Sequence, residues 1–445
     1  MAASEHHRPA FRGPVHLPGE PAYDAHRATW SGKIDPRPAV VAEALTPSDV
    51  RAAVLIAREH GLPFAVQSTG HGTHVPADGA LLLKTSQMAE VLVDPDRRIA
   101  RVGPGAVWAD VIAAAAPCGL APVTGSSPGV GVTGFTLGGG VGWLSRKLGF
   151  AADSLLRADI VTADGRLVRA SANENEDLFW AVRGGGGNFG VVTALELRLH
   201  EVAQVYAGTA SFPIARAAAT LARYRDWASS QPDELTTTIV LTKQAVTVRA
   251  AYIGGADAAE RALRPLWEAS GPPVTSDLRR MGYPETATLG GTPPRRFELF
   301  ADLPDSVIAA AVAAVTEADA NAIEVRHWGG ATARADAGPV GHREVPFSMT
   351  IDGSAEAAAP LAAHATGGSF LNFLQDTSTT RAAYTAADYR RLREVKRSYD
   401  PGNVFADGHN IPPASYPSAQ GTSTESSVGE SRATTYSAAS ASDRF

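Results

Sequence analysis

The chain has 445 residues, of which 44% are hydrophobic and 19% charged, and its formal net charge is −6. This length and apolar content suffice for about two or three globular domains with large cores. The mild negative charge, without a long basic run, argues against a nucleic acid or an anionic membrane surface as partner. A single cysteine, Cys118, excludes an intrachain disulfide and a cysteine-based zinc site.

The two ends of the chain have compositions unlike the rest. Residues 414–445 are mostly Ser, Thr, Ala and Gly, and we expect them and residues 1–13 to be disordered, because they bury too little apolar surface to offset ordering entropy. The N-terminal residues lack the apolar core of a signal peptide, and no stretch reaches the roughly 18 apolar residues of a membrane span. We therefore expect a cytoplasmic protein.

The first half of the chain predicts a mixture of helices and strands. A helix should begin after the N-cap Thr46, with Pro47 in its first turn, and end at Gly61. Another helix is expected at 106–118, and strands at 62–68, 80–85 and 98–105. Residues 158–171 predict a hairpin that turns at Asp164-Gly165. The alternating strand at 191–202 places Val192 and Leu195 on opposite faces.

The second half has a different texture. From residue 204 to about 379, glycine loops are rare and alternating apolar runs are interleaved with Ala-rich helical stretches. This pattern predicts an antiparallel sheet with helices on one face. A last helix, stopped by Asp400-Pro401-Gly402, is too short to stand alone and must pack on one of the domains.

Glycines cluster in three places, at 70–72, 125–142 and 184–190. Two of the clusters match G-x-G-x-x-G, but the first is expected to continue into more glycines and the second into a strand. Both therefore lack the strand–loop–helix context of a Rossmann fold. Backbone N–H groups of such loops bind diphosphates, so the clusters favour a large cofactor with a diphosphate and a planar ring. FAD is the natural candidate.

Two histidines, His71 and His74, stand three residues apart in the first cluster. A transition-metal site usually needs three or four ligands, and residues 60–90 add only His60 and Asp78. We therefore expect no metal site, and we interpret His74 as an ordinary loop residue.

Four blocks of sequence together resemble a known family. They read "QSTGHGTHV", "VTGSSPGVGVTGFTLGGGVGWLSRKLGFAADSLL", "DLFWAVRGGGGNFGVVT" and "YRRLREVKRSYDPGNVFADGHNIPP". In this order and spacing they are similar to FAD-linked oxidoreductases of the berberine-bridge-enzyme type, in the PCMH or vanillyl-alcohol oxidase superfamily, including the bacterial 6-hydroxynicotine-oxidase-like flavoproteins. The likeness is good over 14–203 and 380–413 and weak over 204–379.

The resemblance implies an α+β fold with a PCMH-type FAD-binding domain at 14–203, a substrate-binding domain at 204–379, and a segment at 380–413 that returns to the FAD domain. His71 matches the histidine that is joined to the flavin 8α-methyl group, while Gln67 replaces a family arginine. Ser127 stands where bicovalent members have cysteine, so a single covalent link is implied. The implied FAD contacts are Gln67, Ser68, Thr69, Gly70, His71, Gly72, Gly125, Ser126, Ser127, Val130, Gly131, Gly134, Gly139, Gly190, Val192, His409 and Asn410.

The catalytic residues implied by the family are incomplete here. The family pair Asn-Tyr, whose tyrosine acts as base, reads Asn372-Phe373, so Asn372 is the candidate that is left. Either hydride leaves without a protein base, as a neutral amine allows, or another residue serves. If 322–328 is a strand, then Glu324, Arg326 and Trp328 share a face. That face either lines the substrate pocket or is solvated.

The activity implied by the resemblance is that of an FAD-dependent oxidase. A small organic alcohol or amine would give hydride to FAD, and molecular oxygen would reoxidise the flavin and yield H2O2. A dehydrogenase with another acceptor and a catalytically degenerate FAD-binding protein are the alternatives.

Overall fold

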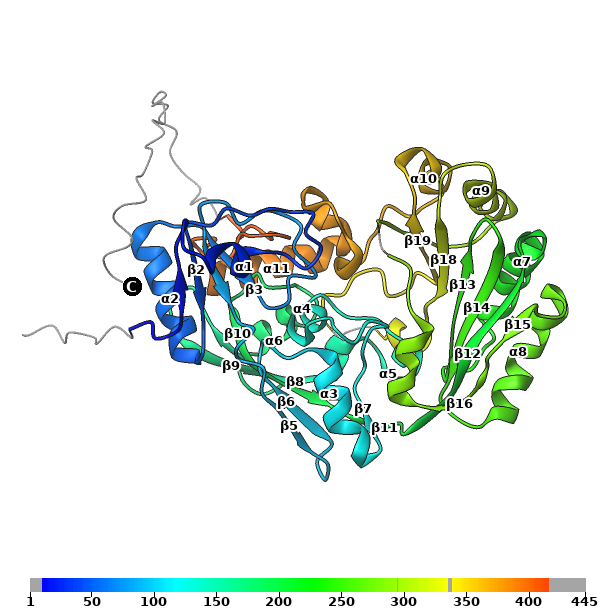
Figure 1. The fold of residues 1–445 in the computed structure, drawn as a ribbon, viewed down its shortest axis with the longest axis horizontal. Helices are drawn as coiled ribbons and strands as arrows, with labels where there is room; N and C mark the ends of the chain where they lie inside the picture. The colour runs from blue at the N-terminus through cyan, green and yellow to red at the C-terminus, as the bar shows by residue number, and fades with distance from the viewer. Residues whose placement is uncertain (1–9, 294, 335–337, 416–445) are drawn as a thin grey trace, which may run out of the picture.

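The computed structural model describes residues 10–293, 295–334 and 338–415. The tails expected to be disordered, 1–13 and 414–445, lie mostly outside these ranges. Figure 1 shows two lobes side by side, one built from the N-terminal half together with the C-terminal helix, the other from the middle of the chain.

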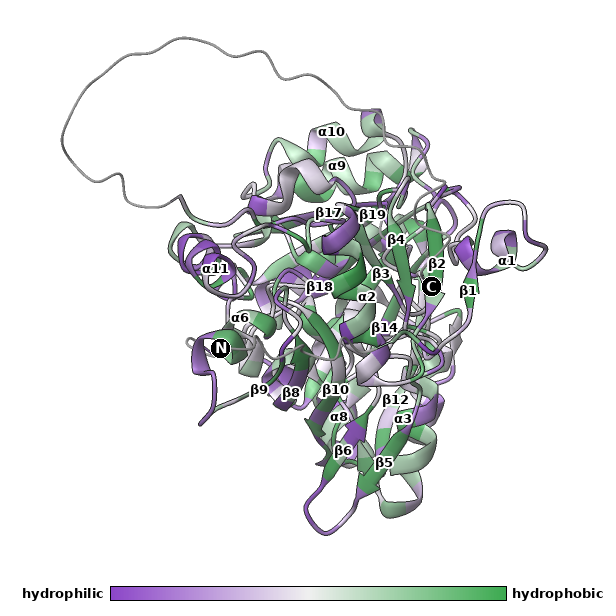
Figure 2. Ribbon diagram, turned by 90° about the vertical axis from the view of Figure 1, so that its left-hand side faces the viewer, coloured by the Kyte–Doolittle hydropathy of each residue, from purple (hydrophilic) through white to green (hydrophobic). Residues whose placement is uncertain are grey.

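One sheet of the first lobe is mainly parallel. Its strands, in spatial order, are β1 (Val15–His16), β2 (Val40–Glu43), β4 (Leu81–Lys84) and β3 (Phe64–Gln67). Helix α2 (Pro47–His60) packs on one face, and the short α1 (Tyr23–Arg27) lies on the other. The predicted caps of α2 are present, because Thr46 accepts a hydrogen bond from the Asp49 N–H and Gly61 has a left-handed φ of 65°. In Figure 2 the strands of this sheet are strongly hydrophobic.

The second sheet of the first lobe is antiparallel. Its order is β5 (Val91–Asp94), β6 (Ile99–Val102), β10 (Val191–Arg198), β8 (Leu155–Val161) and β9 (Leu167–Ser171). The predicted hairpin is β8–β9. The predicted clean alternation of β10 is wrong, because the pairing with β8 shifts by one residue between Val192 and Ala194. This bulge turns Val192 and Leu195 into the same core.

Further short elements surround the antiparallel sheet: α3 (Trp108–Ala115), β7 (Leu120–Ala121), α4 (Val132–Leu137), α5 (Ser145–Leu148), α6 (Glu176–Val182) and β11 (His200–Glu201). Helix α4 contradicts the expectation that the first glycine motif leads into more glycines. The Val132 N–H donates to the Ala106 carbonyl (3.0 Å), and both Val132 and Leu137 are buried. Packing at both ends of α4 thus outweighs the low helix propensity of Gly134.

The second lobe contains one large antiparallel sheet. Its order is β15 (Thr275–Ser276), β12 (Gln204–Pro213), β14 (Ala245–Tyr252), β13 (Leu235–Leu241), β18 (Ala322–His327), β19 (Phe347–Asp352) and β17 (Arg296–Phe300), and β16 (Arg279–Gly282) also pairs with β12. Figure 1 shows the helices on the side of the sheet away from the first lobe: α7 (Ala217–Ala228), α8 (Ala256–Ser270), α9 (Asp305–Thr316) and α10 (Ala355–Ala362). The predicted α+β fold, with an antiparallel sheet covered by helices on one face, is confirmed.

The last helix, α11 (Ala386–Tyr399), packs on the first lobe. Its fully buried Lys396 Nζ donates to the carbonyls of Asn188 and Phe405 (2.8 and 2.9 Å) and to Asp400 Oδ2 (2.7 Å). The exposed side of α11 is hydrophilic (Figure 2). Among the described helices, none is long and apolar enough to cross a lipid bilayer.

Candidate cofactor and substrate site

The three glycine clusters meet in the first lobe. A Cβ atom at Gly131 would lie 3.3 Å from Thr69 Oγ1 and 3.6 Å from Ser68 Oγ, so the loop after β3 touches the loop before α4. The Gly186 N–H donates to the Leu137 carbonyl (3.0 Å), which joins the third cluster to α4. The fold thus gathers the three loops around one region.

His71 lies in the loop that follows β3, half-buried beneath an aromatic ring. Trp30 stacks on its imidazole with ring centroids 4.2 Å apart and planes at 21°. Nδ1 of His71 lies 3.2 Å from Thr69 Oγ1. Burial lowers the pKa of His71, so the imidazole is neutral at pH 7 and its free nitrogen lone pair is available.

The segment that carries Trp30 is tied to the same loop. Gln67 Nε2 donates to the Ala28 carbonyl (3.0 Å), so Gln67 braces the chain just before Trp30. Sequence reasoning missed Trp30, because nothing local marks a residue so distant along the chain as a neighbour of His71.

Several buried polar atoms in the loop after β3, in α4 and in the C-terminal segment have no hydrogen-bond partner among the described residues. They are Ser68 Oγ, Thr133 Oγ1, Thr136 Oγ1 and Asn410 Oδ1. Because buried polar groups are nearly always hydrogen-bonded, four such atoms around the glycine loops fit a polar ligand such as the FAD diphosphate and ring edge. A Cβ atom at Gly72 or Gly134 would meet nothing within 4 Å, so protein packing does not demand glycine there.

Other predicted cofactor residues have packing contacts. A Cβ atom at Gly125 would clash with Phe135, and one at Gly139 with Phe370 and Val340. Gly190 lies against Ile160 and the Val161 carbonyl, and Val192 is buried in the core. Their cofactor role stays a prediction.

His409 meets a histidine that sequence reasoning set aside. Its ring forms an edge contact with His74 at a centroid distance of 5.3 Å. Thr380 Oγ1 lies 2.9 Å from His409 Nδ1, and the Leu374 carbonyl 3.1 Å from Nε2. Burial, with a smaller effect of His74, lowers the pKa of His409 to about 4, and burial also lowers that of His74. Both rings are therefore neutral at pH 7.

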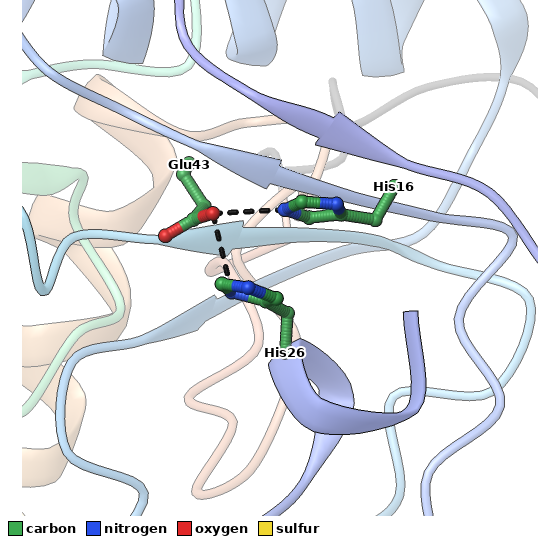
Figure 3. Close-up of side chains that lie close together, drawn as sticks. All are labelled: His16, His26 and Glu43. Atoms are coloured by element: carbon green, nitrogen blue, oxygen red, sulfur yellow. Dashed lines mark hydrogen bonds and ion pairs between the residues drawn. The ribbon is translucent and has the colours of Figure 1, made fainter. Parts of the chain in front are cut away.

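A separate pair of histidines shares a carboxylate at the edge of the parallel sheet. Figure 3 shows His16 and His26 directed at Glu43, with Nε2 of His16 and Nδ1 of His26 at 2.8 and 3.1 Å from the same oxygen. In the described part of the chain, this is the group able to offer three metal ligands. The two rings are stacked, with centroids 4.1 Å apart and planes at 15°. Nearly parallel rings do not direct their in-plane lone pairs at one ion, so we interpret the group as hydrogen-bonded.

Asn372 braces the glycine loop. Its Oδ1 accepts the Gly140 N–H (2.8 Å), and its Nδ2 donates to the Phe135 carbonyl (3.1 Å). The neighbouring Phe373 packs against Phe297 and Phe370, with ring centroids 5.1 and 5.5 Å apart. The side chain of Asn372 is therefore occupied with backbone groups, and Phe373 has no group that could take a proton.

Glu324 lies on the face of the large sheet opposite the helices. It is 5% exposed, so the solvated interpretation of this face is wrong for it. Its Oε2 accepts from Arg249 Nη1 (2.8 Å) and from the Thr292 N–H (3.2 Å), and its Oε1 accepts from Arg326 Nη2 (3.0 Å). Both carboxylate oxygens are engaged, so Glu324 is not a free base.

The neighbours of Glu324 face the first lobe. The guanidinium group of Arg326 lies 5.6 Å from the ring centroid of Trp143. Trp328, just after β18, packs on Phe150 at 5.5 Å and donates from Nε1 to Ser348 Oγ (2.7 Å). The three predicted substrate residues are thus close together between the lobes. Arg249 and Thr292 were missed, since only the strand register and a loop bring them to Glu324.

Comparison with known proteins identifies the family of this chain. Residues 38–171 match the family model "FAD binding domain", and residues 369–412 match the model "Berberine and berberine like". The (R)-6-hydroxynicotine oxidase of Paenarthrobacter nicotinovorans is 32% identical, over 91% of this chain and 97% of that protein. This chain is an FAD-dependent oxidoreductase. It belongs to the family of FAD-linked oxidoreductases of the berberine-bridge-enzyme type.

Solved structures have the same fold. The crystal structure of 6-hydroxy-D-nicotine oxidase from Arthrobacter nicotinovorans matches with a TM-score of 0.80 at 28% identity, covering 91% of this chain and 99% of that one. The glucooligosaccharide oxidase of Acremonium strictum, at 22% identity and a TM-score of 0.79, shares the fold over 91% of this chain and 98% of its own, and carries a 6-S-cysteinyl, 8α-N1-histidyl FAD.

Proposed function

We propose that this protein is an oxidase that carries FAD through a single covalent bond to His71 and acts on a small organic amine or alcohol. The observation that carries the proposal is the neutral, half-buried imidazole of His71 at the meeting point of the glycine loops. Ser127 stands where a second, cysteine link would need sulfur, and Cys118 is exposed at the end of the turn after α3.

The residues of this chain would divide the work of holding FAD. The backbone of 68–72 and 125–134 would bind the diphosphate, while the unpaired Ser68 and Thr133 hydroxyls and the Asn410 amide oxygen would supply side-chain contacts. When bound, FAD would accept hydride from the substrate and pass the electrons to molecular oxygen, with H2O2 as product. Trp30 would shield His71, and Asn372 would hold the Phe135–Gly140 loop in shape.

Neither position 373 nor position 324 would supply a base that takes a proton from the substrate. Phe373 is apolar, and two arginines neutralise Glu324. A neutral amine can lose hydride from the adjacent carbon with its nitrogen lone pair as internal electron donor, whereas an alcohol needs a base for its hydroxyl proton. This arrangement therefore favours an amine over an alcohol.

Acid precipitation tests the covalent link. The native protein should give a yellow pellet, because a covalent flavin stays with the denatured chain, and His71→Ala should release its flavin or contain none. Cys118→Ser is the matched control and should keep the yellow pellet. A colourless native pellet would refute the covalent link, and a yellow His71→Ala pellet would show that the link is at another residue.

The electron acceptor is tested separately. A panel of amines and alcohols is screened in air for bleaching of the flavin and release of peroxide. Bleaching without peroxide, but with reduction of an added dye, would establish the dehydrogenase alternative instead.

A further inference from the structure

The inner face of the large sheet carries a charged cluster in which Glu324 is buried while Arg249 and Arg326 are partly exposed, at 17% and 13%. Arg249 and Arg326 bring two positive charges to the single carboxylate of Glu324. Among the described residues, Glu324 is the ion-pair partner of both arginines, and Arg326 Nη1 is buried without a hydrogen-bond partner. A guanidinium group has five N–H donors, and each arginine uses one of them on Glu324, so donors remain for a further acceptor. The cluster has a net charge of +1.

Arg249 and Arg326 are largely shielded from water, so the extra positive charge has lost much of its hydration. Removing a charge from water is unfavourable unless an opposite charge or hydrogen-bond acceptors replace the water. The planar fork of an arginine matches a carboxylate, with two parallel hydrogen bonds. The charge and the spare donors are thus suited to one further anion.

The cluster lies beside the reacting region. In the strand register, Glu324 of β18 pairs with Thr350 of β19, and Thr350 pairs with Phe297 of β17. Two strand spacings amount to about 10 Å, and Phe297 packs against Phe373, next to the residue that braces the Gly140 loop. Two features therefore lie on one face of the sheet, about two strands apart: the aromatic rings of Phe297 and Phe373, and the positive cluster around Glu324.

We propose that the substrate of this enzyme carries a carboxylate, which binds Arg326 and Arg249, at a distance from its reacting amine or alcohol group, and that the apolar or aromatic part next to the reacting group packs near Phe297 and Phe373. This inference rests on the proposed function of the site and specifies its substrate class. The Arg326 guanidinium is held in place for this role by Glu324 on one side and by the Trp143 ring on the other.

The test compares an acid with its neutral isostere on the flavin-loaded protein. 4-Phenylbutyrate and 4-phenylbutyramide are titrated, and binding is followed by the change in the flavin absorbance spectrum. The acid should bind at least about tenfold more tightly, because a hydrogen bond between charged groups contributes roughly 1.5–3 kcal/mol and 1.4 kcal/mol is a factor of ten. Equal affinities would overturn the proposal.

Two variants of opposite charge separate recognition from a structural role. Arg326→Gln lowers the net charge of the cluster to zero and should abolish the preference for the acid. Glu324→Gln raises the net charge to +2 and should increase the preference. A cluster that only supports the fold would weaken the binding of both ligands alike in both variants, and that result would contradict the proposal.

Controls keep the outcome interpretable. Arg157 is paired with Asp159 and Glu196 on the antiparallel sheet of the first lobe, so Arg157→Gln removes a comparable ion pair elsewhere and should leave the preference unchanged. If Arg326→Gln does not fold, Arg326→Lys keeps the charge without the fork and should give an intermediate preference. A native protein without flavin would refute the proposed function, whereas a flavin-loaded oxidase without acid preference would refute this inference alone.

Discussion

At the scale of single residues, the site depends on side chains that hold others in place. His71 is the predicted anchor, yet its surroundings are set by Trp30, which is 67% exposed and stacks on it, and by Gln67, which braces the segment before Trp30. The stacking contact, rather than the exposure of the tryptophan, is the evidence that Trp30 covers one face of the imidazole. Asn372 likewise positions another part of the site, because its side chain holds the loop between Phe135 and Gly140.

Replacement of Asn372 should test that part. Asn372→Leu leaves the Gly140 N–H and the Phe135 carbonyl without their partners, so the free energy of unfolding should fall by about 1–3 kcal/mol. Urea unfolding of the flavin-containing protein measures this change. The exposed Asn173→Leu is the control and should have little effect. A loss below about 0.5 kcal/mol, the range of ordinary surface substitutions, would contradict the bracing role.

At the scale of elements, helix α11 closes the first lobe through a buried ion pair. Lys396 and Asp400 are both fully buried, and Asp400 also accepts the N–H groups of Val404 and Phe405 (2.8 and 2.9 Å). Burial lowers the pKa of Lys396, partly offset by Asp400. The pair fixes the chain just before His409 and Asn410, so its integrity bears on the predicted cofactor site.

Lys396→Met should therefore be strongly destabilising. It leaves the Asp400 carboxylate buried without its cation, and the loss of one partner of a buried pair costs about 3–5 kcal/mol. The exposed pair Arg166–Asp164 offers the control, since Arg166→Met should change the free energy of unfolding by about 0–1 kcal/mol. Chemical denaturation measures both, and similar losses in the two variants would refute the role of the buried pair.

At the scale of the whole molecule, buried arginines join the two lobes. Arg146 of α5 donates from Nε to the Leu235 carbonyl (2.7 Å), and from its Nη atoms to the carbonyl of Trp328 and to His327 Nδ1 (2.9 Å). Arg343 from the second lobe binds both oxygens of Asp153 in the first (3.0 and 2.8 Å). These bonds tie α5 and the segment around Asp153, both in the first lobe, to the second lobe.

The burial of His327 beside Arg146 makes the molecule sensitive to acid. Burial, and secondarily the charge of Arg146, lower the pKa of His327 to about 3. Because the unfolded His binds a proton near its ordinary pKa of about 6.5, the folded state binds fewer protons between these values. This contribution to stability is complete above about pH 6.5 and is lost as the pH falls toward 3.

His327→Asn should reduce this acid sensitivity. Its amide oxygen can still accept from Arg146, but it does not titrate. Below pH 6.5, the slope of unfolding free energy against pH should fall by up to about 1.4 kcal/mol per pH unit, the value for one proton. Burial raises the pKa of Asp407 to about 6, so this residue adds stability as the pH falls, the opposite of His327. The effect of His327 is therefore measured as the difference between the variant and the native protein, by urea unfolding of both at pH 5 and 7.5. Identical slopes would refute the assignment.

What the sequence by itself determined is mostly local. The caps of α2, the hairpin turn at Asp164-Gly165 and the alternating runs of the large sheet depend on near neighbours, and they were predicted correctly. The four blocks also sufficed to identify the family. The bulge in β10 and the helix α4 were missed, because strand pairing and core packing, rather than local propensity, decide them.

The tertiary structure alone decided which side chains meet. Trp30 over His71, His74 against His409, and two arginines around Glu324 join residues that are far apart in the chain. Their contact depends on sheet register and on how the lobes pack, which no local pattern encodes. Charge balance in this cluster is likewise a property of the folded protein, because it depends on which charges share a space from which water is largely excluded. For that reason the sequence identifies the family, whereas the charge on the inner face of the large sheet can be seen only in the fold.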